Sequence, residues 1–229
     1  MRSKATAGAA FGRGPLSRGA ALVHTLLTVE ALFLATLSPS LAGLLFLGGA
    51  PNNLPLAALC LLPLGPALAA ALYALHHRST DLAELHPART YLRGLNLNSV
   101  AALRIWMPLS AWMTVITYTL THFAATGLPS WWAALLAVIG CGSLLWGANA
   151  LVLTALFTFR AVDTARLAGH FLLRRPGASA GAASLLVVAA AGTWWLTEAL
   201  PLLLASLMLL SLLHSSRRMI AEAREDFTC

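Results

Sequence analysis

Long apolar segments alternate with short connections along this chain, and the basic residues follow the alternation. Six apolar segments can be drawn, at residues 21–47, 54–75, 99–123, 131–157, 182–195 and 201–213. A helix needs about 20 apolar residues to cross the hydrocarbon core of a bilayer, and most of the segments come near that length. The pattern predicts an all-α, polytopic transmembrane bundle of six helices, of which the last two are short.

The fifteen Lys and Arg residues set the orientation of this bundle. They precede the first segment, separate the second from the third and the fourth from the fifth, and follow the sixth, with Arg104 just inside the third. The other connections hold no basic residue. Because cytoplasmic loops retain Lys and Arg while short translocated loops are depleted of them, we expect both termini to be cytoplasmic.

The domain organisation follows from the same pattern. Residues 1–20 are mostly Gly, Ala, Ser and basic types, so we expect a flexible cytoplasmic tail that cannot bury enough surface to order itself. Residues 21–216 form the membrane domain, and 217–229 form a second cytoplasmic tail. In the connections 76–98 and 160–175, leucines at helical spacing among polar residues predict short helices on the inner membrane surface, the first pair divided at Pro87.

Composition excludes several classes of protein. With 59% hydrophobic and 10% charged residues and a mean hydropathy of +0.76, the chain is not a water-soluble globule. The net charge of +7 is spread over four cytoplasmic segments without interleaved aromatics, which argues against nucleic acid and for anionic lipid headgroups. The spacing of Cys60, Cys141 and Cys229 predicts neither a metal site nor a disulfide framework.

The second apolar segment contains a predicted helix break. Pro63 and Pro66 flank Gly65 near its middle, and proline removes backbone donors and pushes against the preceding turn. A break at membrane depth persists only where protein or water satisfies the freed carbonyls, so this region should face the bundle. The alanines at 67–71 favour close helix packing or self-association, as do the small residues at 140–143.

Three polar residues within the apolar segments are the candidate intramembrane site. Glu30 is the only carboxylate well inside a segment, where a charge costs several kcal/mol unless it is paired, neutral or hydrated. Arg104 enters the membrane from the same side, so an ion pair with Glu30 is sterically reasonable. Asn149 lies near the middle of the fourth segment. We expect structural roles for all three, namely an ion pair and an amide that cross-links two helices.

No pattern for enzymatic chemistry is present. The sequence has no nucleophile elbow, phosphate loop, dinucleotide fingerprint or His-Glu-x-x-His motif, so we expect no catalytic, cofactor or metal site. An enzyme acting on lipid-linked sugars would need paired acids, and Asp81, Glu84 and Asp163 are ordinary loop residues. Tryptophans, including Trp106, are expected in the aromatic belts at the membrane interfaces.

Three motifs carry a resemblance to a known family. They are LGPALAAALY at 64–73, YLRGLNLN at 91–98 and WMP at 106–108. The chain resembles the YesL-like family of small bacterial integral membrane proteins, a domain of unknown function. Because its members tend to occur beside carbohydrate uptake systems, the resemblance implies a non-enzymatic accessory protein of the bacterial cytoplasmic membrane that binds an ABC transporter permease through its cytoplasmic loops.

Two other functions stay open at this point. The protein could act as a homo-oligomer joined through its small-residue faces. It could also be a small secondary transporter or channel in which Glu30, Asn149 and the break at Pro63–Pro66 form a polar site near the midplane.

Overall fold

The computed structural model describes residues 15–47, 53–78, 86–157, 159–174, 176–195, 203–217 and 220–222. Within these ranges all regular secondary structure is helical, as predicted. The elements are α1 (Pro15–Leu47), α2 (Leu54–Cys60), α3 (Leu64–His76), α4 (Pro87–Thr121), the 3-10 helix η3 (Phe123–Thr126), α5 (Trp131–Leu156), α6 (Ala161–Arg174), α7 (Pro176–Trp195) and α9 (Ala205–Ser215).

Four stretches of the described chain are long and apolar enough to cross a bilayer, which indicates a membrane protein. They are Ser17–Leu47, Leu54–His76, Pro87–Thr121 and Trp131–Leu156. They correspond to the first four predicted segments. The region of the two remaining predicted segments contains α7, of 20 residues, and α9, an apolar helix of 11 residues.

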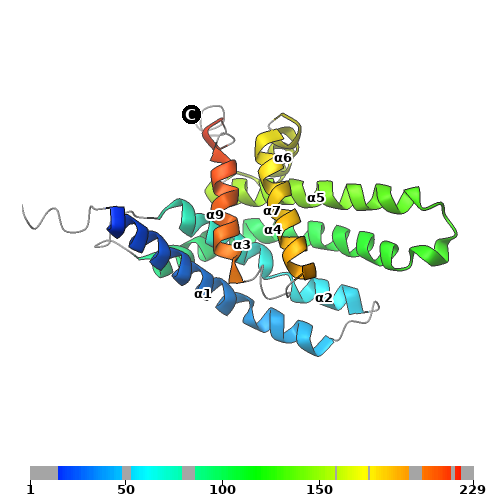
Figure 1. Ribbon diagram of the computed structural model, residues 1–229, viewed down its shortest axis with the longest axis horizontal. Helices are drawn as coiled ribbons and strands as arrows, with labels where there is room; N and C mark the ends of the chain where they lie inside the picture. Colours follow the sequence, from blue (N-terminus) through cyan, green and yellow to red (C-terminus); the bar gives the residue numbers. More distant parts are fainter. Residues whose placement is uncertain are drawn as a thin grey trace, which may run out of the picture.

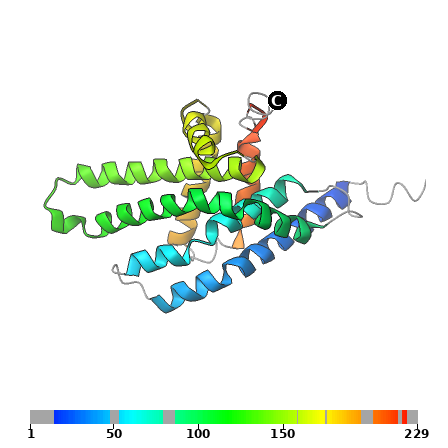
Figure 2. The same cartoon turned by 180° about the vertical axis from the view of Figure 1, so that it is seen from behind.

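The helices form two groups that cross each other. In Figures 1 and 2, α4 and α5 run side by side along the long axis, whereas α7 and α9 run across that direction. Helix α3 lies in the centre and contacts α1, α4, α5 and α9. Its alanines at 67, 69, 70, 71 and 74 are at most 1% exposed. The close helix packing predicted for the 67–71 face is therefore confirmed, and this chain's own helices leave that face no surface for self-association.

Two helices begin earlier than the sequence predicts. Helix α4 starts at Pro87 and continues without interruption into the membrane stretch, so residues 87–98 are not a separate surface helix. Proline is tolerated at the first position of a helix, where its missing N–H has no intrahelical partner to lose. Helix α1 starts at Pro15 and carries Arg18, ahead of the predicted start at Ala21.

Other predictions concerning the ends and connections are met in part. Helix α6 confirms the helix expected within 160–175. At the turn after α1, the side-chain amide of Asn53 donates a hydrogen bond to the carbonyl of Leu47, one of the last carbonyls of that helix. The flexible tail predicted at 1–20 is wrong for residues 15–20, which are the first residues of α1. Residues 1–14 of that tail, residues 218–219 and 223–229 of the tail predicted at 217–229, and residues 79–85 of the first connection lie outside the described residues.

The motifs that carry the family resemblance lie largely where α4 packs against its neighbours. Gly94 faces Tyr73 of α3, and a Cβ added to that glycine would lie 2.8 Å from the Tyr73 ring. The hydroxyl of Tyr91 shares a 3.1 Å hydrogen bond with Thr36 of α1. Asn98 donates its side-chain amide to the carbonyl of Ala155, in the last turn of α5, at 3.3 Å. These motif residues hold helices together.

Candidate functional site

The predicted break in the second membrane stretch is present between α2 and α3. Pro63 cannot donate to the carbonyl of Leu59, which instead accepts the amide of Leu62 at 3.2 Å. The carbonyl of Leu61 accepts the indole N–H of Trp106, on α4, at 3.0 Å. The prediction that neighbouring protein satisfies the break is thus confirmed, and Trp106 is the residue that supplies the donor.

Gly65 allows α3 and α4 to approach each other at the break. A Cβ added at Gly65 would lie 2.5 Å from both Cβ and Cγ of Trp106, a distance that real Cβ atoms essentially never show. Pro66 follows it inside α3 and contributes no N–H. Gly65, which lies between the two prolines of the predicted break, is therefore packed against the indole ring of Trp106.

Glu30 lies where α1 meets α9, and only 8% of it is exposed. Its Oε2 accepts the backbone N–H of Ser206 at 2.7 Å. Ser206 is the second residue of α9, and the first N–H groups of a helix have no intrahelical acceptor. The carboxylate thus caps a helix N-terminus, where the helix dipole favours negative charge. The predicted pairing with Arg104 is wrong, since the Arg104 side chain is exposed and Glu30 bonds to α9.

Two buried polar residues, on α1 and on α5, have unpaired side-chain atoms. Oε1 of Glu30 has no hydrogen-bond partner. Asn149 on α5 is fully buried, and neither its amide nitrogen nor its oxygen makes a hydrogen bond. The expected cross-link from Asn149 to another helix is therefore absent, and nearby Thr154 donates to the carbonyl of Ala150. Buried polar atoms without partners are rare in folded proteins, so they mark places where a ligand, an ion or water could bind.

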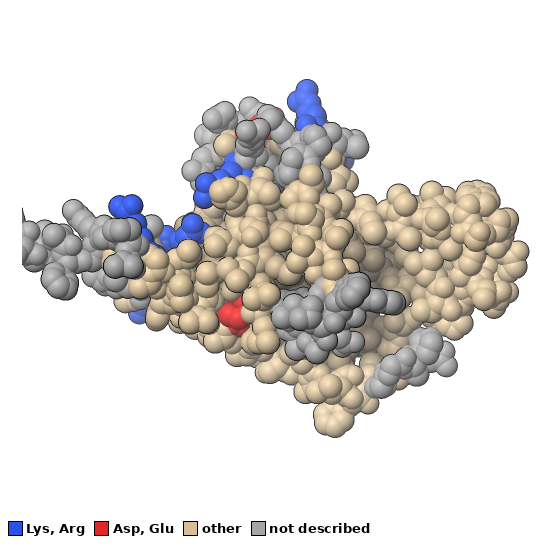
Figure 3. Space-filling model, in the orientation of Figure 1, with Lys and Arg blue, Asp and Glu red and all other residues tan. Residues whose placement is uncertain are grey.

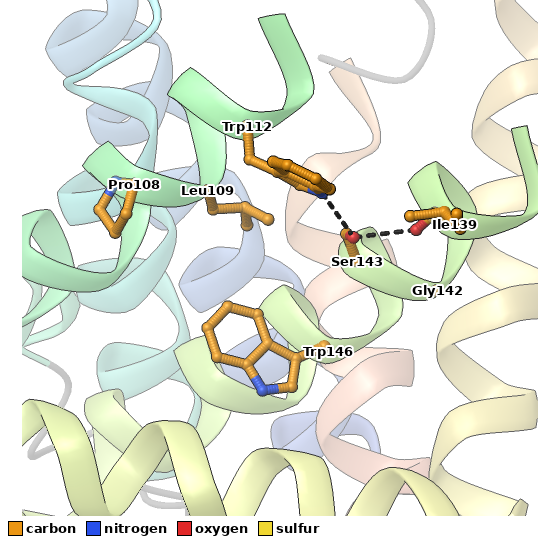
Figure 4. Close-up of a pocket in the computed structure, with 7 residues that line it drawn as sticks. All are labelled: Pro108, Leu109, Trp112, Ile139, Gly142, Ser143 and Trp146. Atoms are coloured by element: carbon orange, nitrogen blue, oxygen red, sulfur yellow. Dashed lines mark hydrogen bonds between the residues drawn. The ribbon is translucent and has the colours of Figure 1, made fainter. Parts of the chain in front are cut away.

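A groove between α4 and α5, which the sequence did not reveal, is one concave site in the described part of the chain (Figure 4). Its volume is about 400 Å³. Here the α4–α5 groove means the space bounded by Pro108, Leu109, Trp112, Ile139, Gly142, Ser143 and Trp146. The α5 members recur at helical spacing, but the same spacing describes any helix face, so sequence alone could not single them out.

Hydrogen bonds within the α4–α5 groove are made by three of its residues. The indole N–H of Trp112 donates to Oγ of Ser143 at 3.2 Å, and that hydroxyl donates to the carbonyl of Ile139 at 2.9 Å (Figure 4). The indole N–H of Trp146 donates to the carbonyl of Ala165 at 3.0 Å and so ties α5 to α6. Every polar hydrogen on the groove's side chains is therefore already donated.

Helix α6 carries a second cavity, of about 510 Å³. It is lined by Phe159, Asp163, Arg166, Leu167 and His170. The opposite face of α6 is buried through Thr164, Ala168 and Phe171. In Figures 1 and 2, α6 is seen foreshortened beside α5, so its axis departs from that of α5. One face of α6 is thus packed against the rest of the protein, and the other face presents charged and apolar side chains.

Charged residues are absent from one end of the face drawn in Figure 3. On the face drawn in Figure 3, Lys and Arg lie beside the start of α1 and around α6 and the end of α9, whereas the end formed by η3 shows no charge. The sequence agrees, because positions 105–159 contain no Asp, Glu, Lys or Arg. The outer halves of α4 and α5 are therefore suited to a wholly apolar environment.

The described residues contain no group of three or more His, Cys, Asp and Glu side chains that could hold a metal ion. Asp81 and Glu84 lie outside the described part of the chain. No family model, no curated protein and no solved structure matches this chain.

Proposed function

We propose that this chain is a non-enzymatic accessory protein of the bacterial cytoplasmic membrane that binds the permease of a carbohydrate ABC uptake system. The observation that carries the binding role is α6, a well-packed helix whose outward surface combines Arg166 and His170 with exposed Val162, which is 62% exposed. The nature of the partner follows from the resemblance to the YesL-like family, and membership of that family is part of the proposal.

The polar groups in the membrane stretches support a binding role over a chemical one. Trp106 gives its N–H to the helix break, and Glu30 uses one carboxylate oxygen to cap α9. These polar side chains, which the sequence singles out within the membrane stretches, thus make contacts that hold helices together. The exposed charged side chains of α6 are not engaged in this way and remain available to a partner.

The proposal includes a topology of six crossings with both termini in the cytoplasm. The charge pattern supports it, because Lys and Arg occur only beside alternate connections. In this orientation α6 lies on the cytoplasmic side, where the cytoplasmic domains and loops of a permease complex are accessible. Helices α7 and α9 run across the direction of α4 and α5 in Figures 1 and 2, so the two further crossings of this topology require both helices to reorient in the bilayer.

Site-specific photo-cross-linking tests the partner role. A photoreactive amino acid at Val162 on α6 should give an adduct with a permease in native membranes, identified by mass spectrometry. Val138 on α5 is the matched control, because it is also an exposed valine, 68% exposed, but lies on the charge-free outer part. A permease adduct at Val162 alone supports the proposal, whereas the absence of any adduct there would contradict it.

The unpaired buried atoms favour one alternative, a small secondary transporter or channel. Oε1 of Glu30 and both polar atoms of Asn149 are buried without partners, which a purely structural role does not require. Glu30→Gln separates the two functions, since glutamine preserves an acceptor oxygen for the N–H of Ser206 but removes the charge. Normal uptake by the folded variant would exclude a charge-dependent pathway through Glu30, and abolished uptake would favour it.

A further inference from the structure

We infer that the α4–α5 groove binds one acyl chain of an anionic phospholipid, with the headgroup toward α6. The groove lies between two candidate membrane-spanning helices and within the charge-free stretch 105–159. The inference requires that the chain be embedded in a bilayer with α6 at the level of the headgroups, and it does not require a permease partner.

The hydrogen bonds of the groove determine the polarity of its occupant. Trp112, Ser143 and Trp146 have each donated their only side-chain polar hydrogen to a protein acceptor. A polar ligand would have to leave its own groups unpaired or break these bonds, and both outcomes cost free energy. A hydrocarbon chain requires no partner and gains contacts with the indole faces.

The volume of the groove favours a single chain over a protein helix. An α-helix with side chains is about 10–12 Å wide and rises 5.4 Å per turn, so one turn occupies roughly 400–600 Å³. The groove measures about 400 Å³ and could not hold the body of even a short helix. It falls within the range of about 300–1,000 Å³ that is usual for small-ligand sites.

The charge of α6 determines the preferred headgroup. The end of the groove formed by Pro108 and Trp146 is the end nearest α6, because Trp146 donates to Ala165. Between 160 and 174, α6 and the residue before it carry Arg160, Arg166 and Arg174 against Asp163 as the only acid. A negative headgroup at this end is therefore attracted by an excess of positive charge.

Gly142 provides the variant that tests the inference. A Cβ at Gly142 would meet no atom within 4 Å, so a leucine there fills the groove without displacing the backbone. Cys141→Leu is the matched control, because Cys141 is the next residue, is exposed and does not line the groove. Both changes introduce the same side chain on the same helix.

The measurement is native mass spectrometry of protein released from bilayers with equal amounts of phosphatidylglycerol and phosphatidylcholine. We expect the natural chain and Cys141→Leu to retain phosphatidylglycerol preferentially. We expect Gly142→Leu to retain about tenfold less, the loss that some two methylene contacts would give. Equal retention by both leucine variants would overturn the inference, as would a second copy of the chain or another protein in place of lipid.

A second measurement guards against misfolding of Gly142→Leu. Phospholipids brominated along the acyl chain quench tryptophan fluorescence by contact. The contribution of Trp112 is the difference in quenching between a chain that contains Trp112 and the same chain with Trp112→Phe. That contribution should be large in the otherwise natural chain and small in Gly142→Leu, and an equal contribution in both would contradict a chain in the groove.

Discussion

The hydrogen bond from Trp106 to the helix break yields the sharpest prediction about stability. Trp106→Phe keeps an aromatic ring beside Gly65 but removes the N–H that bonds to Leu61 at 3.0 Å. The carbonyl of Leu61 keeps a second donor, the amide of Leu64 at 3.1 Å, so it is not left wholly unpaired. The loss is then one hydrogen bond, about 0.5–1.5 kcal/mol net, and the smaller ring raises it to about 1–2 kcal/mol.

The assay is unfolding in mixed micelles with increasing dodecyl sulfate, followed by circular dichroism. Trp112→Phe is the control, because its indole N–H bonds to Ser143 at an exposed site, and we expect a change within about 0.5 kcal/mol. Equal losses of unfolding free energy in the two variants would refute the reasoning. So would an unchanged free energy in Trp106→Phe, since the break would then not depend on α4.

Four further predictions rest on separate contacts. Gly65→Ala should lower the unfolding free energy by about 1–3 kcal/mol through overpacking, and Gly142→Ala, which meets open space, should not; equal effects would contradict the packing argument. Glu30→Ala should weaken the cap of α9 by about 0.5–2 kcal/mol, seen as faster amide hydrogen exchange in that helix, and unchanged exchange would count against the cap. Asn149→Leu should raise the unfolding free energy by about 1–3 kcal/mol because it removes unpaired buried atoms, and a fall would mean that the amide has a partner. A cysteine at exposed Thr126, in a chain whose own three cysteines are serine, should react with an impermeant maleimide added outside intact cells; protection would reverse the orientation.

The features that the sequence predicted correctly have local causes. Hydropathy over about 20 residues is enough to recognise a candidate membrane stretch. The break between α2 and α3 was predictable because Pro63 and Pro66 lack the N–H groups that a continuous helix needs. Because lipid offers no hydrogen-bond donor, the sequence also predicted that neighbouring protein supplies one at the break. It did not predict that Trp106 is that donor.

The features that the sequence missed depend on contacts between distant residues. Arg104 was the expected partner of Glu30 because both residues enter the membrane from the same side. The uncharged backbone N–H of Ser206 donates the hydrogen bond to Glu30 instead. Every residue except proline has a backbone N–H, so no sequence pattern could reveal which one bonds to Glu30. Pro87 was interpreted as a breaker although proline equally starts helices, and only the placement of the following turns decides between these roles. The α4–α5 groove needs two helices in register before it exists.

The contact between Glu30 and α9 also has a consequence for biosynthesis. The two partners are 176 positions apart, so Glu30 leaves the ribosome long before the amide that receives it has been made. During that interval α1 holds a carboxyl group in the membrane without its hydrogen-bond donor, and a polar group at that depth is costly until a partner is present. Insertion of the early helices therefore does not complete the fold, because α1 gains this contact only after α9 has been made.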